Sequence, residues 1–197
     1  MANQDAAFGL RPLKTVGQQD DSTGMGQHFI AAGEASAMFQ GSLVSSPATG
    51  TGYIDIAGLT DVLNVGAFWG CFYDDPTTRK PTFSNYYPGG ITPPQSQDIE
   101  AFVYDSPYQM FEIQSAATGA SAQADIYKCC DLASNGGSTS NGVSSAESAY
   151  TFDAGPRQLK VMGVSRDPEN SDITAANVNW RVMICEHLYG SGTAGAA

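Results

Sequence analysis

The sequence predicts a mainly β protein, with a single antiparallel β-sandwich or barrel-like domain and an extended N-terminal arm. Charged residues make up 15% of the chain, well below the usual quarter, whereas glycine is abundant at 22 of 197 residues. Helices in soluble proteins normally carry Glu and Lys on their wet faces, so this composition favours short strands joined by many turns. Several segments also alternate between apolar and polar residues, the period of a strand buried on one face.

Residues 1–26 are expected to form the arm. Their apolar residues follow neither a helical nor a strand period for long, and Pro12 removes a backbone donor and favours extended geometry at Arg11. Such an arm can order on a partner, and the alternative is a frayed terminus. We expect the β domain over residues 27–188 and a flexible tail over residues 189–197.

Strands are expected where apolar residues alternate, or run together, between turn residues. These segments are 27–31, 37–40, 42–44, 53–56, 64–73, 80–87, 98–104, 109–114, 150–152, 159–164 and 178–187. The run over 64–73 is apolar on both faces, which predicts a buried central strand whose glycines mark a bulge or a close backbone approach. Residues 98–104 and 109–114 form the strongest predicted hairpin. One short helical turn is expected over 121–127.

The charge balance argues against a nucleic-acid partner. The formal net charge is -11 and the nine basic residues are scattered, whereas phosphate binding needs clustered Lys and Arg. No apolar run is long enough to span a bilayer, and the first residues lack the apolar stretch of a signal peptide. We therefore expect no membrane partner, and synthesis in a cytoplasm.

The sequence offers no catalytic, cofactor-binding or metal-ligand motif, so we expect neither an enzyme nor a cofactor nor a metal site. The cysteines are expected to be reduced thiols packed as small apolar residues, and they are Cys71, Cys129, Cys130 and Cys185. A cysteine hydrolase is the alternative, and it would need one unusually acidic thiol with His28 as its base. Glu186 and His187 are interpreted as an ordinary strand end, because neighbours on a strand point to opposite faces.

Loop carboxylates and clustered aromatic residues leave two further alternatives open. Acidic pairs near residues 20–21, 74–75 and 167–169 are interpreted as turn chemistry, with a structural cation as the alternative. Aromatic residues gather over 69–87 and 102–111, mostly as core and cross-strand pairs. Exposed aromatics on a β-sandwich can also bind sugars, so an acidic module recognising host surface glycans is the alternative function.

Short motifs spread along nearly the whole chain resemble one family. The chain opens Met-Ala-Asn-Gln-Asp-Ala-Ala-Phe-Gly-Leu-Arg-Pro, and a Tyr-Tyr-Pro-Gly-Gly turn follows in its middle. The matching motifs occupy residues 1–12, 30–33, 38–44, 66–70, 86–90, 98–107 and 182–187. Together they resemble the capsid decoration (cement) proteins of tailed bacteriophages, similar to small cyanophage and other phage head cement proteins. The chain departs from the family in its Ser/Gly-rich loop at 134–148 and in its adjacent Cys129 and Cys130.

The resemblance implies a structural virion protein that decorates and stabilises the expanded capsid by bridging subunits of the major capsid protein. It implies a homotrimer, or alternatively a homodimer, on the outer surface of the capsid, made in the cytoplasm of the host bacterium. Phe8, Leu10 and Pro12 would be the apolar anchors of the capsid-binding arm, and Arg11 and Lys14 would pair with capsid carboxylates. Deleting residues 2–14 should then abolish capsid binding and leave the domain folded.

Overall fold

The computed structural model describes residues 3–16, 24–116 and 121–190. Within these ranges it is mainly β and antiparallel, which confirms the predicted fold class. The elements, in chain order, are β1 (Arg11–Thr15), β2 (Gly26–Ile30), β3 (Leu43–Ser45), β4 (Asp55–Ile56), β5 (Asn64–Asp74), β6 (Pro81–Ser84), the 3-10 turn η1 (Pro94–Ser96), β7 (Ile99–Tyr104), β8 (Gln109–Gln114), the 3-10 turn η2 (Gln123–Asp125), β9 (Cys129–Cys130), β10 (Leu132–Ser134), β11 (Glu147–Ser148), β12 (Leu159–Val164) and β13 (Asn179–Ile184).

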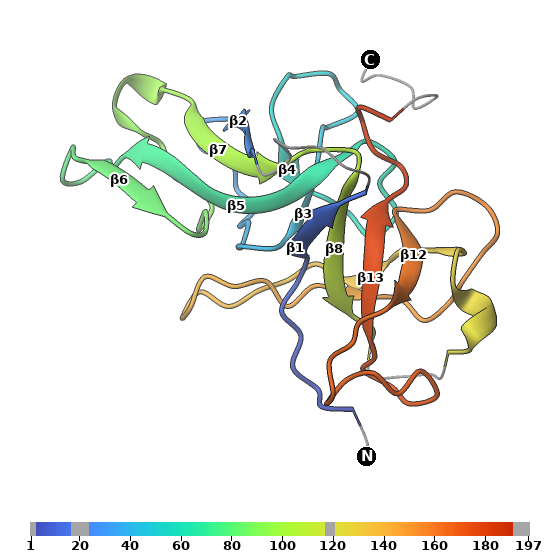
Figure 1. The fold of residues 1–197 in the computed structure, drawn as a ribbon. Coiled ribbons are helices and arrows are strands. Elements are labelled where there is room, and N and C mark those ends of the chain that lie inside the picture. The colour runs from blue at the N-terminus through green and yellow to red at the C-terminus, as the bar shows by residue number, and fades with distance from the viewer. Residues whose placement is uncertain (1–2, 17–23, 117–120, 191–197) are drawn as a thin grey trace.

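Two antiparallel sheets make up most of the domain. The five-stranded sheet has the order β1-β8-β13-β12-β9, and the six-stranded sheet has the order β2-β7-β5-β3-β4 with β6 paired to β5. Strands β10 and β11 form a separate two-stranded ribbon. Figure 1 shows that the end of the larger sheet carrying β6, β5 and β7 extends away from the five-stranded sheet.

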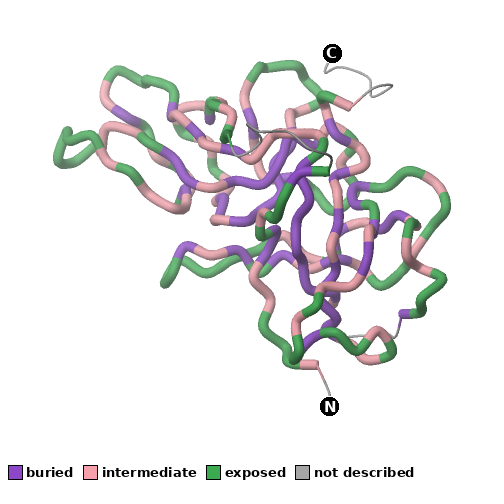
Figure 2. The backbone as a smooth tube through the Cα atoms, viewed as in Figure 1, coloured by how far each residue is buried: buried purple, intermediate pink, exposed green. Residues whose placement is uncertain are grey.

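A hydrophobic core joins the two sheets. Trp180 of β13 and Phe111 of β8 are fully buried on the inner face of the five-stranded sheet. Leu43 of β3 and Ala67 of β5 enter the same core from the six-stranded sheet. The sheets therefore contact each other face to face, as in a β-sandwich. Figure 2 shows that buried, purple segments of the chain gather in the middle of the domain.

A second core lies on the six-stranded sheet and is closed by loops. Phe68 of β5 and Val103 of β7 pack there with Met38 and Tyr87, two loop residues joined by an antiparallel bridge. The hydroxyl of Tyr87 donates a 2.6 Å hydrogen bond to the backbone carbonyl of Glu34, so the buried phenol is satisfied. The loop with the Tyr-Tyr-Pro-Gly-Gly turn and the loop around Met38 thus form part of this core.

Strand β5 is the buried central strand that the apolar run predicts. Its two glycines lie where the backbone of a neighbour approaches closely, because a Cβ on Gly66 would clash with the carbonyl oxygen of Tyr104 in β7. A bulge shifts the β5–β7 register between Phe68 and Gly70. Both the bulge and the close approach agree with the prediction.

The hairpin predicted from residues 98–104 and 109–114 is wrong. Strand β7 pairs with β2 and β5, whereas β8 pairs with β1 and β13 in the other sheet. The turn at residues 105–107 therefore carries the chain from one sheet to the other. All of β8 is buried because it lies inside the five-stranded sheet (Figure 2). Turn residues between two strands do not by themselves distinguish a hairpin from such a crossover.

Some of the shorter elements expected from the sequence are present in the structure and others are not. The helical turn expected over 121–127 is η2, and the closing strands β12 and β13 pair as antiparallel neighbours. The strands expected over 37–40 and 150–152 are wrong, because only isolated bridges form at or beside them. The acidic pair at residues 20–21 and the tail beyond residue 190 lie outside the described residues.

The N-terminal segment is extended, as expected, but it lies on the domain. Strand β1 pairs with β8 at the edge of the five-stranded sheet (Figure 1), and Leu10 is buried in the core between the sheets. The Leu10 N–H donates to the carbonyl of Gly41 at 2.8 Å, and the Ala6 N–H donates to the Gln114 side chain at 2.9 Å. Removing this segment would take out an edge strand and a core side chain, contrary to the expectation that it can be deleted without unfolding.

Candidate partner-binding edge strand

The five residues expected to bind a partner lie on β1 or just before it. Arg11 and Lys14 are exposed, and Phe8 and Pro12 are half-buried. Leu10 is only 1% exposed and packs in the domain's own core, so its expected role as an anchor for a partner is wrong. The structure thus leaves four of the five side chains available at the surface, on the edge strand β1 or just before it.

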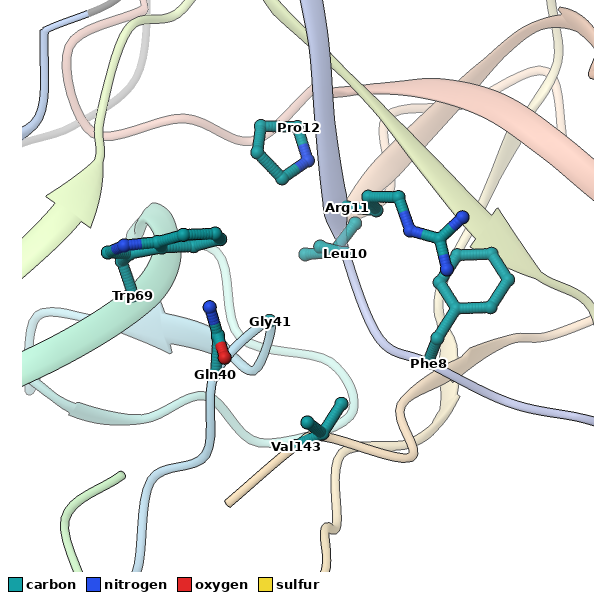
Figure 3. Close-up of a pocket in the computed structure, with 8 residues that line it drawn as sticks. All are labelled: Phe8, Leu10, Arg11, Pro12, Gln40, Gly41, Trp69 and Val143. Atoms are coloured by element: carbon teal, nitrogen blue, oxygen red, sulfur yellow. The ribbon is translucent and has the colours of Figure 1, made fainter. Parts of the chain in front are cut away.

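An apolar hollow of about 310 Å³ opens beside the start of β1. Its lining residues, shown in Figure 3, are Phe8, Leu10, Arg11, Pro12, Gln40, Gly41, Trp69 and Val143. Trp69 occupies the β5 bulge, and its ring meets that of Tyr104 edge-on at 5.4 Å between centroids. The hollow can take an apolar side chain from a partner, because its walls are largely aromatic and aliphatic.

Arg11 is held in place at the rim of this hollow. Its guanidinium lies over the ring of Phe8 at 4.0 Å from the centroid, as Figure 3 shows. Its Nη1 is also 3.3 Å from Oε2 of Glu112, which lies opposite it in β8. The cation–π contact and the ion pair fix a side chain that is otherwise exposed, so Arg11 is preorganised at the surface.

A second hollow, of about 300 Å³, lies where the other end of β1 meets the outer face of the five-stranded sheet. Its lining residues are Lys14, Thr15, Val16, Met110, Tyr127, Met162 and Arg181. Two of these side chains are cations and none is a carboxylate. Such a lining suits an acidic group carried on an apolar stem, because the methionines offer apolar contact beside the two positive charges.

Two features of the second hollow are unusual. The Nε of Arg181 is buried and has no hydrogen-bond partner among the described residues. Tyr127 is 69% exposed and has a left-handed backbone, with φ at 73°, which its N–H bond to the carbonyl of Val161 at 2.8 Å helps to hold. Unsatisfied donors and left-handed non-glycine residues are costly, and they concentrate at binding sites.

The edge strand also concentrates positive charge in an acidic protein. Three of the nine basic residues, Arg11, Lys14 and Arg181, border the two hollows, although the net charge of the chain is -11. Sequence reasoning missed Arg181 and Tyr127, and it singled out Trp69 only as one of the clustered aromatic residues, most of which were expected in the core. The alternation in β13 gave a partial signal, because buried Trp180 and Val182 place Arg181 on the opposite face. Nothing local in the sequence indicates that this face lies beside β1.

The histidines form part of a buried polar cluster that the sequence did not predict. His28 Nε2 is 3.1 Å from Asp105 Oδ2, and the rings of His187 and Tyr189 lie 5.5 Å apart. Burial lowers the pKa of His187 to about 4. Burial alone would raise the pKa of Asp105, but the hydrogen bond and charge of His28 outweigh it and hold that pKa below its ordinary value.

Glu186 and His187, expected to form a plain strand end, are instead held against β5. The Asn64 N–H donates to the carbonyl of Glu186 at 3.1 Å, and the Leu188 N–H donates to the carbonyl of Asn64 at 2.7 Å. His187 is only 1% exposed, and its Nδ1 accepts a 3.1 Å hydrogen bond from the Tyr189 N–H. This segment therefore ties the end of the five-stranded sheet to the other sheet.

The four cysteines are free thiols. Burial raises the pKa of Cys71 and of Cys130 to about 12, the opposite direction from that of a nucleophilic cysteine. Over residues 3–16, 24–116 and 121–190, no three His, Cys, Asp or Glu side chains are grouped so that they could hold a metal ion. The described part of the chain also contains no helix with the length and apolarity to cross a membrane.

No protein-family model matches the chain, and neither a curated protein nor a solved structure matches it.

Proposed function

We propose that this protein decorates and stabilises the expanded capsid of a tailed bacteriophage by bridging subunits of the major capsid protein. One observation carries the proposal. The opening motif that resembles decoration proteins, residues 1–12, leads into the exposed edge strand β1, which lies between an apolar and a cationic hollow. In this proposal the protein is a homotrimer, or alternatively a homodimer, on the outer surface of the virion.

The edge strand supports this role through three kinds of contact. The outer edge of β1 can pair with an extended segment of a capsid subunit, as exposed edges do in strand addition. The hollow beside Phe8 and Trp69 would receive an apolar side chain of that segment, and Lys14 and Arg181 would bind its carboxylates. Many weakly bound copies around a shell add up to a large stabilisation of the whole particle.

Charge reversal at Lys14 tests this surface. We expect Lys14→Glu to weaken binding to expanded shells by about tenfold, because it places a carboxylate where the proposal has a partner carboxylate. The measurement is the protein concentration that half-saturates shells assembled without the protein, from co-sedimentation. Lys80→Glu is the matched control, since Lys80 is also an exposed lysine but lies in the β5–β6 turn.

Raising the salt concentration should reduce the difference between wild type and Lys14→Glu, because ions screen exposed charges. Half-saturation by Lys14→Glu at the wild-type concentration would exclude β1 as the binding edge. Retention of the protein on surface polysaccharides, with no binding to shells, would instead favour the glycan-binding module.

A further inference from the structure

Two of the cysteines approach each other on the outer face of the five-stranded sheet. Cys129 Sγ and Cys185 Sγ lie 3.8 Å apart. Cys129 is in β9, opposite Lys160 of β12, and Cys185 follows β13, where its N–H donates to the carbonyl of Gln158 at 2.8 Å. The two thiols therefore come from strands on either side of β12. Their sequence neighbours Cys130 and Ile184 point into the core, so alternation places both thiols outward.

We propose that Cys129 and Cys185 are an oxidisable dithiol that closes into a disulfide when the protein leaves the reducing cytoplasm. A disulfide needs the sulfurs about 2.05 Å apart, so the gap must close by a little under about 2 Å. Because the two cysteines flank β12, closure requires the two-residue strand β9 to shift toward β13 as the side chains rotate. The chemistry depends only on these two thiols. A role for this disulfide in stabilising the released virus particle rests on the proposed capsid function.

The oxidant would be a low-molecular-weight disulfide of the glutathione class. The thiolate of Cys185, the more exposed of the two, attacks one sulfur of the oxidant and releases one small thiol, which leaves a mixed disulfide on Cys185. The thiolate of Cys129 then attacks the Cys185 sulfur and releases the second small thiol. Two protein thiols are oxidised, one small disulfide is reduced to two thiols, and the two protons end on those products.

The other two cysteines are buried in the hydrophobic cores, where they cannot compete with Cys129 and Cys185 for the oxidant. Cys71 is fully buried in the core of the six-stranded sheet and Cys130 in the core between the sheets. Burial raises the pKa of both to about 12, so almost no thiolate forms there near neutral pH. Burial, and then the neighbouring Cys185, also raise the pKa of Cys129, so the resolving step should speed up as the pH rises. Oxidation is thus expected to be selective for one pair.

The cross-link would join β9 to β13 and tie together residues that are 56 positions apart in the chain. Closing a loop of that size restricts the unfolded chain and stabilises the folded one. For a domain of this size we expect the Tm to rise by about 5–10 °C on oxidation. The ribbon β10–β11 and strand β12 lie within the closed loop, so they would be held most strongly.

The test uses the purified full chain, incubated with oxidised glutathione or with a strong reductant, then denatured and alkylated. Peptide mapping by mass spectrometry should find Cys129 joined to Cys185 in the oxidised sample, with two thiols rather than four open to alkylation. Thermal unfolding of the same samples should show the rise in Tm.

Cys185→Ser should abolish both the cross-link and the rise in Tm, whereas Cys71→Ser should abolish neither. The proposal is overturned if the wild type keeps four alkylable thiols, if glutathione stays attached to Cys185, or if the disulfide joins two chains. None of these readouts involves a capsid, so a failure here and a failure of capsid binding can be told apart.

Discussion

Replacing Leu10 with alanine is expected to lower the free energy of unfolding by about 3 kcal/mol, in the range measured when buried leucines are truncated. Leu10 is 1% exposed and packs between the two sheets, although it belongs to a segment whose sequence indicates a free arm. The loss of its side chain leaves a cavity that the surrounding core fills only in part. Urea unfolding at neutral pH provides the measurement.

Leu13→Ala is the matched control, because Leu13 lies in β1, just beyond Leu10, and is 36% exposed. Truncating it should cost less than about 1 kcal/mol. Deleting residues 3–14 should cost more than either substitution, since it removes β1 together with Leu10. Equal stabilities for Leu10→Ala and Leu13→Ala would show that the N-terminal segment is a free arm after all.

Acidification from pH 7 to about pH 4 is expected to lower the free energy of unfolding by about 3 kcal/mol through His187. Burial holds the folded-state pKa of His187 at about 4, against 6.5 for an ordinary histidine. As the pH falls through 6.5, His187 of the unfolded chain therefore binds a proton, whereas His187 of the folded chain stays neutral until the pH reaches about 4. Stability is fully present above that pH and is lost as the pH falls toward 4. Urea unfolding at a series of pH values measures the slope.

His187→Asn should flatten this slope, because asparagine does not titrate and its side-chain oxygen can still accept the hydrogen bond from the Tyr189 N–H. His28→Gln is the control, since it leaves His187 in place. The nearby carboxylate of Asp105 titrates below its ordinary pKa of 3.8, so its contribution is lost only at still lower pH. A slope between pH 7 and pH 4 that is identical in His187→Asn and wild type would exclude His187 as its source.

Individual strands could be predicted from the sequence, because burial on one or both faces leaves a local pattern. The double-faced apolar run of β5 and the alternation in β13 are examples. The partners of a strand are set by contacts between distant residues, which is why β7 and β8 look like a hairpin and yet belong to different sheets. Fold class is therefore more predictable than topology.

The site was partly predictable for the same reason. The sequence around β1 lacks the apolar–polar alternation of a strand, because the register of β1 with β8 shifts between Pro12 and Thr15. Buried Leu10 and exposed Lys14 therefore follow no single alternation. The cationic hollow joins Lys14 to Arg181, and the dithiol joins Cys129 to Cys185. Both depend on strand order in the five-stranded sheet, which no local motif specifies.

Co-sedimentation of the wild-type protein with expanded and unexpanded shells assembled without it is the most direct test of the proposed capsid role. The proposal predicts saturable binding to expanded shells alone, with a plateau ratio that identifies the symmetry axis it occupies and a solution mass that gives the oligomer. Absence of binding to either shell, by protein that is folded and soluble, would contradict it.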